Sequence, residues 1–98
     1  MTKTVTKVDG GRAVLGGMVM TVHDVDITSY TASGEPLTAA NLGLVALIDV
    51  IPISKEKFVS AWYDYANSKL RVFGDTTIAT ESTATTDCGV IRVTAFGY

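Results

Sequence analysis

Apolar and polar residues alternate along several short stretches of the chain, and this pattern predicts β-strands. The clearest stretch is 90–98, where Ile91, Val93 and Ala95 fall on one side of an extended chain. Successive side chains of a strand point to opposite faces, so this spacing produces one apolar face. Thr, Val and Ile are also frequent throughout the chain, and such β-branched side chains suit a pleated sheet better than a helix.

Two further stretches predict strands in the middle of the chain. Residues 44–53 are apolar at both odd and even positions, which is typical of a strand buried on both faces. Pro52 cannot donate a backbone hydrogen bond, so it marks the end of this strand or an edge position. Residues 58–65 predict the next strand and 70–72 its returning partner, joined by a tight loop at 66–68 in which Asn67 tolerates a positive φ.

The apolar positions shift by one residue within 18–27. Met20 and Val22 share one face, whereas Val25 and Ile27 fall on the other. One extra residue in a strand produces such a shift. The pattern therefore predicts a β-bulge around residues 23–24, or a corner where the chain passes between two packed sheets.

Only one helical segment is expected. Thr38 is a suitable N-cap residue and Gly43 a suitable terminator, so a single helical turn is predicted from Thr38 to Leu42. Leu37 and Leu42 have the spacing of a hydrophobic staple, in which residues on either side of a helix start pack together.

These elements predict an all-β fold, a small β-sandwich or jelly-roll-like barrel of about six to eight strands. Residues 1–11 are predicted to form an extended N-terminal arm, because they are mostly Thr and Lys up to a turn at 9–11. The arm is expected to pair at a sheet edge or to reach onto a neighbouring subunit. Residues 12–98 then form one β-sandwich domain, with an exposed loop expected at 81–86.

Composition excludes several classes of function. The net charge is −2 and the Lys and Arg residues are scattered, so no basic surface for nucleic acid is expected. The longest apolar stretch, 42–53, is interrupted by Asp49 and Pro52 and is shorter than the ~20 residues of a membrane span. The first residues lack the apolar core of a signal peptide, which predicts synthesis and retention in a cytoplasm. Cys88 is the only cysteine, which excludes an internal disulfide and leaves a buried thiol or an intermolecular bridge.

Candidate chemistry is sparse, and no enzyme is predicted. His23 is the only histidine, and it lies near Asp24 and Asp26. Neighbouring side chains of a strand point to opposite faces, so a shared metal site would need a bulge, and a surface or interface histidine is the simpler interpretation. Asp49 and Asp64 are a possible acid–base pair, with hydrogen-bonded aspartates as the simpler interpretation. No nucleophile or cofactor-binding motif is found.

Two groups of residues are candidates for contact with a partner protein. The aromatic residues Trp62, Tyr63 and Tyr65 lie close together and suit a protein hot spot, a sugar-stacking platform or the core and its rim. Of these, Trp62 and Tyr65 are the predicted partner contacts. The second group is the arm, namely Thr2, Lys3, Thr4, Val5, Thr6 and Lys7.

Several segments resemble small structural proteins of tailed bacteriophages. The resemblance is carried by residues 26–44 (DITSYTASGEPLTAANLGL), by residues 63–72 (YDYANSKLRV) and by the closing apolar strand at 90–98. It extends from Val25 onward and does not include the N-terminal arm. The proteins concerned are head decoration, cement or minor capsid proteins.

The resemblance implies a β-sandwich on the outer surface of a tailed-phage capsid, made in the host cytoplasm and carried in the virion. Such a protein binds major capsid subunits, stabilises the shell without catalysis or a cofactor, and self-associates, commonly as a homotrimer. Two alternatives remain from the sequence. One is a head–tail connector or tail-tube component, and the other is a carbohydrate-binding β-sandwich that uses Trp62, Tyr63 and Tyr65.

Overall fold

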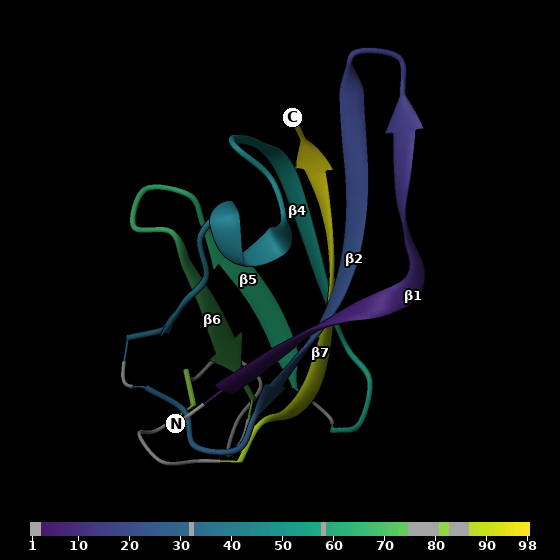
Figure 1. Cartoon of the computed structure of the whole chain (residues 1–98). Coiled ribbons are helices and arrows are strands. Elements are labelled where there is room, and N and C mark those ends of the chain that lie inside the picture. Colours follow the sequence, from purple (N-terminus) through teal and green to yellow (C-terminus); the bar gives the residue numbers. More distant parts are fainter. Residues whose placement is uncertain (1–2, 32, 58, 75–80, 83–86) are drawn as a thin grey trace.

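The protein is a small β-sandwich in the computed structural model, which describes residues 3–31, 33–57, 59–74, 81–82 and 87–98 (Figure 1). The strands are β1 (Lys3–Leu15), β2 (Met18–Ile27), β3 (Glu35–Pro36), β4 (Leu47–Ser54), β5 (Ser60–Asp64), β6 (Lys69–Phe73) and β7 (Gly89–Gly97).

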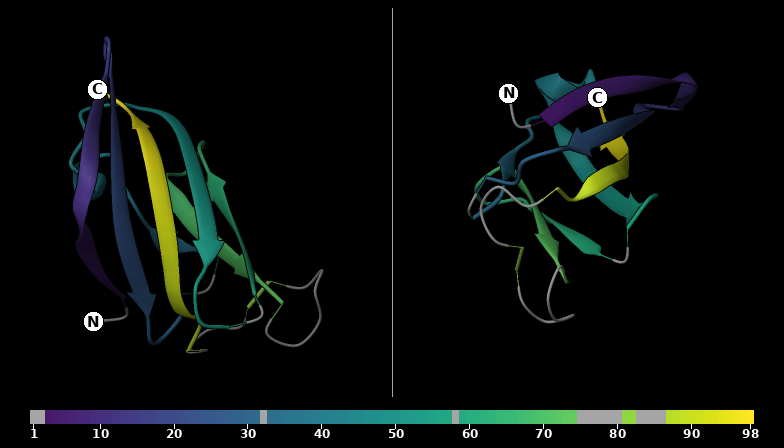
Figure 2. Two further views of the ribbon diagram at one scale, coloured as in Figure 1. Left: turned by 90° about the vertical axis from the view of Figure 1, so that its right-hand side faces the viewer. Right: turned by 90° about the horizontal axis from the view of Figure 1, so that it is seen from below.

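The strands form two antiparallel sheets, which confirms the predicted all-β sandwich. The larger sheet has the order β1–β2–β7–β4, and the smaller sheet has the order β3–β6–β5. Figure 2 shows the four strands of the larger sheet side by side in one curved layer, with β5 and β6 behind them. The sheets do not close into a barrel. The β1–β2 hairpin continues past the other strands at one end of the molecule (Figure 1). The whole molecule is 42 Å long and 27 by 24 Å across.

The hydrophobic core lies between the two sheets. Ile91, Val93 and Ala95 of β7 are fully buried, which confirms the apolar face predicted from their alternation. Fully burying a side chain such as Ile91 or Leu70 stabilises a fold by about 1.5–3 kcal/mol. The other fully or almost fully buried apolar side chains are Val25, Ile27, Tyr30, Leu37, Leu42, Tyr63, Leu70, Val72 and Cys88.

A register shift lies in β1 and not in β2, so the predicted bulge around residues 23–24 is wrong. The pairing of β1 with β2 shifts between Lys7 and Arg12. The pairing of β2 with β7 is uninterrupted from Val19 to Ile27. A bulge depends on how many residues each of two paired strands contributes, so one strand's pattern does not locate it.

Gly11 explains why β1 can bulge at this point. A Cβ atom at Gly11 would lie 2.7 Å from the carbonyl oxygen of Val8 and 2.8 Å from that of Val22. Only glycine permits this close approach of the two backbones. Residues 9–11 thus belong to the strand, and the turn predicted there is wrong.

β2 carries apolar side chains on both faces, and this produced the apparent shift in its pattern. Val25 and Ile27 are fully buried and face the core. Met20 and Val22 occupy the alternate positions and are only partly covered. The strand is regular, and part of its outer face is apolar.

β4 is not buried on both faces, contrary to the prediction from residues 44–53. Val50 is buried, whereas Ile51 and Ile53 are 44% and 60% exposed. The strand lies at one edge of the larger sheet, in agreement with the edge position predicted from Pro52. In the part of the chain that the structure describes, no third layer covers the outer face of this sheet.

The predicted helical turn is present and shorter than expected. The 3-10 turn η1 (Ala40–Leu42) follows Ala39 and ends at Gly43, whose φ is 72°. The backbone N–H of Thr38 donates to Oδ1 of Asn41 at 2.9 Å, which ties down the start of the turn. Within the described ranges, no helix is long and apolar enough to cross a membrane.

The loop between β5 and β6 differs from the prediction in one residue. Ser68, not Asn67, has the positive φ, at 53°. Asn67 instead donates from Nδ2 to Oδ2 of Asp64 at 2.9 Å, so its side chain closes the loop. The exposed loop predicted at 81–86 lies mostly outside the described residues, and Ser82, which is described, is buried.

Candidate functional site

The outer face of the larger sheet carries apolar side chains on three neighbouring strands. Met20 of β2 lies opposite Phe96 of β7. Thr94 of β7 lies opposite both Val22 of β2 and Ile51 of β4. Residues opposite one another on a sheet have Cβ atoms about 4.5–5.5 Å apart, so these side chains are neighbours.

The β1–β2 hairpin extends the same face beyond the sandwich. Leu15 of β1 lies opposite Met18 of β2, on the face of Met20, and Leu15 is 49% exposed. We call the whole set the outer apolar face. It comprises Leu15, Met18, Met20, Val22, Ile51, Ile53 and Phe96. Single exposed apolar residues are normal on soluble proteins, but contiguous apolar surface of this kind marks contact sites.

One end of the outer apolar face is bordered by an ion pair. Nε and Nη2 of Arg92 donate to the two carboxylate oxygens of Asp24 at 2.9 and 3.1 Å. These hydrogen bonds lower the pKa of Asp24 below its ordinary value. The pair lies across from Ile53, since Ile53 is opposite Arg92. A bound surface would therefore meet apolar side chains toward the C-terminal end of β7 and charges toward the other end.

Tyr65 closes the free edge of β4. Its hydroxyl accepts a hydrogen bond from the backbone N–H of Val50 at 2.9 Å and donates to Oδ1 of Asp49 at 2.9 Å. The ring of Tyr65 also meets Tyr63 edge to face, with centroids 5.0 Å apart. The predicted contact residue Tyr65, whose side chain is half exposed, thus has a structural role that the sequence did not reveal. The available signal was Asp49, which interrupts an apolar strand.

Removal of the Tyr65 hydroxyl is expected to weaken this edge. Tyr65→Phe keeps the ring contact but removes the hydroxyl's hydrogen bonds with Val50 and Asp49, although the N–H of Val50 still donates to Oδ1 of Asp49 at 3.0 Å. We therefore expect a loss of about 1 kcal/mol in the free energy of unfolding. Urea denaturation measures this loss. Tyr98→Phe is the matched control, because Tyr98 is 60% exposed at the chain end. Equal stability of the two variants would contradict the assigned role.

The structure separates the predicted contact residues. Lys3, Val5 and Lys7 lie in β1 opposite β2 residues 23–27, with Val5 packed against the core. Thr4 and Thr6 alternate with them and lie opposite Asp26 and Asp24. Thr2 is outside the described residues. The arm residues that the structure describes are therefore part of the sheet.

Trp62 lies on a different surface from the outer apolar face. It belongs to β5 of the smaller sheet, opposite Arg71, and is 52% exposed. Its neighbour Tyr63 points to the opposite side, is buried, and donates its hydroxyl to the carbonyl oxygen of Leu37 at 2.6 Å. A sugar platform made of Trp62, Tyr63 and Tyr65 is wrong for this reason, because Tyr63 cannot offer its ring to a ligand.

His23 faces the core, so its interpretation as a surface histidine is wrong. It is 7% exposed, and its Nδ1 atom has no hydrogen-bond partner among the described residues. Burial lowers the pKa of His23, and the neighbouring Lys7 ammonium lowers it further. Asp24 points away from it, as expected for adjacent residues of a regular strand. No group of three potential metal ligands occurs in the described ranges.

The buried imidazole makes stability depend on pH. The pKa of His23 in the folded protein lies below its ordinary value of 6.5, so the unfolded chain binds a proton first as the pH falls below that value. We expect the melting temperature to fall as the pH drops from about 7 to 5, and His23→Leu to reduce this fall without lowering stability at neutral pH. Thermal melts across this range measure both effects. An unchanged pH profile in the variant would contradict this role of His23.

The remaining polar clusters hold the fold together. Nη2 of Arg71 pairs with Oε1 of Glu81 at 2.9 Å, and the Tyr30 hydroxyl donates to Oε2 of Glu81 at 2.5 Å. The same hydroxyl accepts from the N–H of Val72 at 3.2 Å, which connects the β2–β3 loop to β6. Asp64 bonds Asn67, whereas Asp49 bonds Tyr65, so the two aspartates serve separate contacts.

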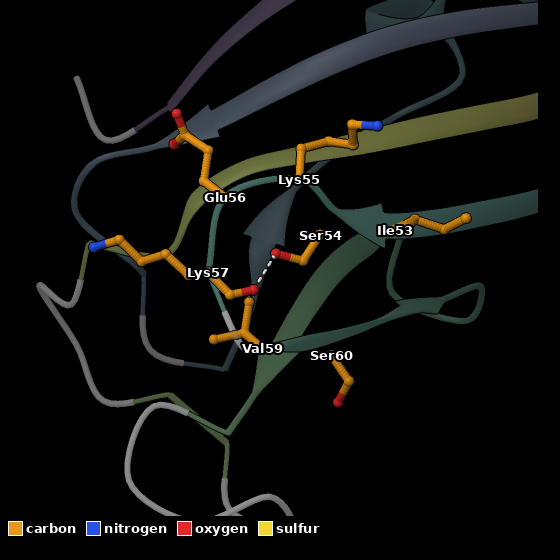
Figure 3. A pocket seen from close by; sticks show the side chains of 7 residues that line it. All are labelled: Ile53, Ser54, Lys55, Glu56, Lys57, Val59 and Ser60. Atoms are coloured by element: carbon orange, nitrogen blue, oxygen red, sulfur yellow. Dashed lines mark hydrogen bonds between the residues drawn. The ribbon is translucent and has the colours of Figure 1, made fainter.

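A surface hollow of about 550 Å³ lies where β4 continues into β5 (Figure 3). Two of the charged residues around it, Glu56 and Lys57, hold this connection. Oε1 of Glu56 accepts from the N–H of Val90 at 3.1 Å, and Nζ of Lys57 donates to the carbonyl oxygen of Asp87 at 3.0 Å. Ser54 also donates to the carbonyl oxygen of Lys57, the bond drawn in Figure 3. The hollow is thus a weaker candidate than the outer apolar face.

Sequence reasoning did not identify the outer apolar face as a site. Its signal was present, because 18–27 and 44–53 carry apolar residues at both odd and even positions. Comparison of the chain with protein family models, with curated proteins and with solved structures finds no match.

Proposed function

We propose that the protein is a non-catalytic structural protein that attaches to the outer surface of a tailed-phage capsid by binding major capsid subunits. The observation that carries the binding role is the outer apolar face. It places Ile51 and Ile53, about half exposed, on the same side of a sheet as Met20 and Phe96. Leaving this surface in water is unfavourable, and covering it with another protein removes that cost.

The capsid as partner follows from the resemblance of residues 26–44, 63–72 and 90–98 to head decoration proteins. Those segments include the β2–β3 loop, η1, the β5–β6 hairpin and β7, which hold the sandwich together. The fold expected from the resemblance, a small β-sandwich, is also the fold of this chain. The resemblance further favours self-association as a homotrimer.

The geometry is compatible with attachment without chemistry. A specific interface needs roughly 800 Å² of surface from each partner. An oligomer that presents several outer apolar faces at once gains effective affinity from the linkage of its contacts. A rigid sheet is suited to this task because little conformational entropy is lost when it binds.

Co-sedimentation with empty capsids tests the proposal. The capsids are assembled from the major capsid protein encoded in the same genome, and the full chain is added in increasing amounts. We expect the protein to pellet with the capsids until many copies per shell are bound. Light scattering of the free protein should give the molar mass of a trimer. A protein that stays in the supernatant at every concentration would contradict capsid attachment. Saturation at a single ring per shell would favour a head–tail connector instead.

A further inference from the structure

The two edges of the larger sheet differ in whether they can accept another strand. At the β4 edge, the N–H of Val50 already donates to the Tyr65 hydroxyl at 2.9 Å. Pro52, two residues later, points its backbone nitrogen to the same side of the strand and has no N–H to donate. This edge is therefore closed to a regular backbone ladder.

The β1 edge, in contrast, has no hydrogen bond from another described element that would keep a further strand from pairing with it. β1 spans Lys3–Leu15 and is the outermost strand of its sheet. Within the described part of the chain, its backbone pairs with β2 alone. Figure 2 shows β1 along the margin of the sandwich in both views. Arg12 and Val14, near the far end of the strand, are exposed.

The charge of β1 indicates what kind of strand would fit. β1 carries Lys3, Lys7 and Arg12 against the single carboxylate of Asp9, a net charge of +2, although the whole chain has a net charge of −2. A second β1 strand would bring like charges together across the new pair, which is unfavourable. An acidic strand would place opposite charges there.

We propose that the free edge of β1 binds an extended acidic segment of a partner protein as a fifth strand of the larger sheet. Main-chain hydrogen bonds would hold the segment, and alternate side chains would continue the two faces of the sheet. On the outer side these side chains would lie beside Ala13 and Leu15 and enlarge the outer apolar face. The register shift between Lys7 and Arg12 divides the edge into two short pairing stretches, which selects for a matching segment.

This inference rests on the proposed function, because the acidic segment would belong to the capsid protein that the chain binds. Its test, however, needs no capsid. The probe is a synthetic peptide that alternates Thr and Val and carries two Glu residues. One companion peptide has Lys in place of Glu. A second has consecutive amides N-methylated, so that neither of its two edges can donate ladder hydrogen bonds. Each is titrated to millimolar concentration against the full chain labelled for NMR.

We expect the acidic peptide to shift the amide signals of residues 3–7 and 12–15 and to slow their hydrogen exchange. The N-methylated peptide should do neither, and the Lys peptide should bind more weakly. Lys7→Glu should weaken binding of the acidic peptide about fivefold, as expected for reversal of one exposed charge contact. Lys55→Glu, at an exposed residue beyond β4, is the matched control and should bind as the natural chain does.

Several outcomes would overturn the inference. They are the absence of shifts at millimolar peptide, equal binding of the acidic and Lys peptides, or shifts confined to β4. Concentration-dependent self-association that protects the β1 amides without peptide would assign the edge to a second copy instead. Capsid co-sedimentation is scored separately, so edge pairing can fail while the proposed function holds, and the reverse.

Discussion

Gly97→Ala is expected to lower the free energy of unfolding by about 3 kcal/mol, at the upper end of the cost of overpacking a well-packed site. A Cβ atom at this position would lie 2.0 Å from the carbonyl oxygen of Ala46 and 3.0 Å from its carbonyl carbon. These are backbone atoms of a neighbouring segment, so no side-chain rotation relieves the contact.

The segment that contains Ala46 cannot easily move away from Gly97. The carbonyl oxygen of Tyr98 accepts hydrogen bonds from the N–H groups of Val45 and Ala46 at 2.6 and 2.9 Å. The N–H of Tyr98 donates to the carbonyl oxygen of Ala46 at 3.1 Å. Displacement of Ala46 would break these bonds, which secure the connection between η1 and β4 against the end of β7.

Thermal melts followed by circular dichroism measure this effect. For a domain of this size, a loss of about 3 kcal/mol corresponds to a fall of roughly 15 °C in Tm. Gly17→Ala is the control, because nothing lies within 4 Å of a Cβ atom added at Gly17. Equal melting temperatures for the two variants would contradict the close approach of Gly97 and Ala46.

Ile51→Lys is expected to reduce capsid binding by about thirtyfold, the loss typical of an interface hot spot. Ile51 lies on β4 at one edge of the outer apolar face, opposite Thr94 of β7, which in turn lies opposite Val22 of β2. A lysine there would carry an unpaired charge into an apolar contact, where desolvation is costly. The side chain is 44% exposed in the free protein, so the fold should tolerate the change within about 0.5 kcal/mol.

Val45→Lys provides the matched control for this experiment. Val45 is also apolar and is 86% exposed, but it lies in the segment between η1 and β4 and not on the outer apolar face. Both variants are compared with the natural chain by capsid co-sedimentation and by thermal melts. Equal weakening by the two substitutions would show that the outer apolar face is not the contact surface. Undiminished binding of Ile51→Lys would lead to the same conclusion.

Alternation along the chain determined the fold class and much of the core. The spacing of Ile91, Val93 and Ala95 identified a strand with one buried face, and the structure has all three fully buried. The turn near Thr38 to Leu42 was also predictable, because a terminating glycine acts within a few positions, although its N-cap is Ala39 and not the predicted Thr38. Such local rules need no knowledge of which strands meet.

The pairing of strands decided two features that the alternation of apolar residues did not determine, namely which faces are covered and where the bulge lies. Residues 44–53 are apolar at odd and even positions, and the sequence alone could not distinguish a strand covered on two sides from one covered on a single side. The answer depends on sheet order, which places β4 at an edge and leaves Ile51 and Ile53 uncovered by described residues. The bulge likewise depends on the register between β1 and β2, a property of the pair.

Contacts between residues distant in sequence decided the rest. Tyr65 closes the β4 edge through Asp49 and Val50, and His23 faces the core beside Lys7. The amino-acid sequence therefore determined which residues of β7 share the buried face, but not how the faces of β1 and β2 are composed. Only the tertiary structure decided which faces are covered and which edge stays open, because covering a face or an edge requires a second element brought there by the folded chain.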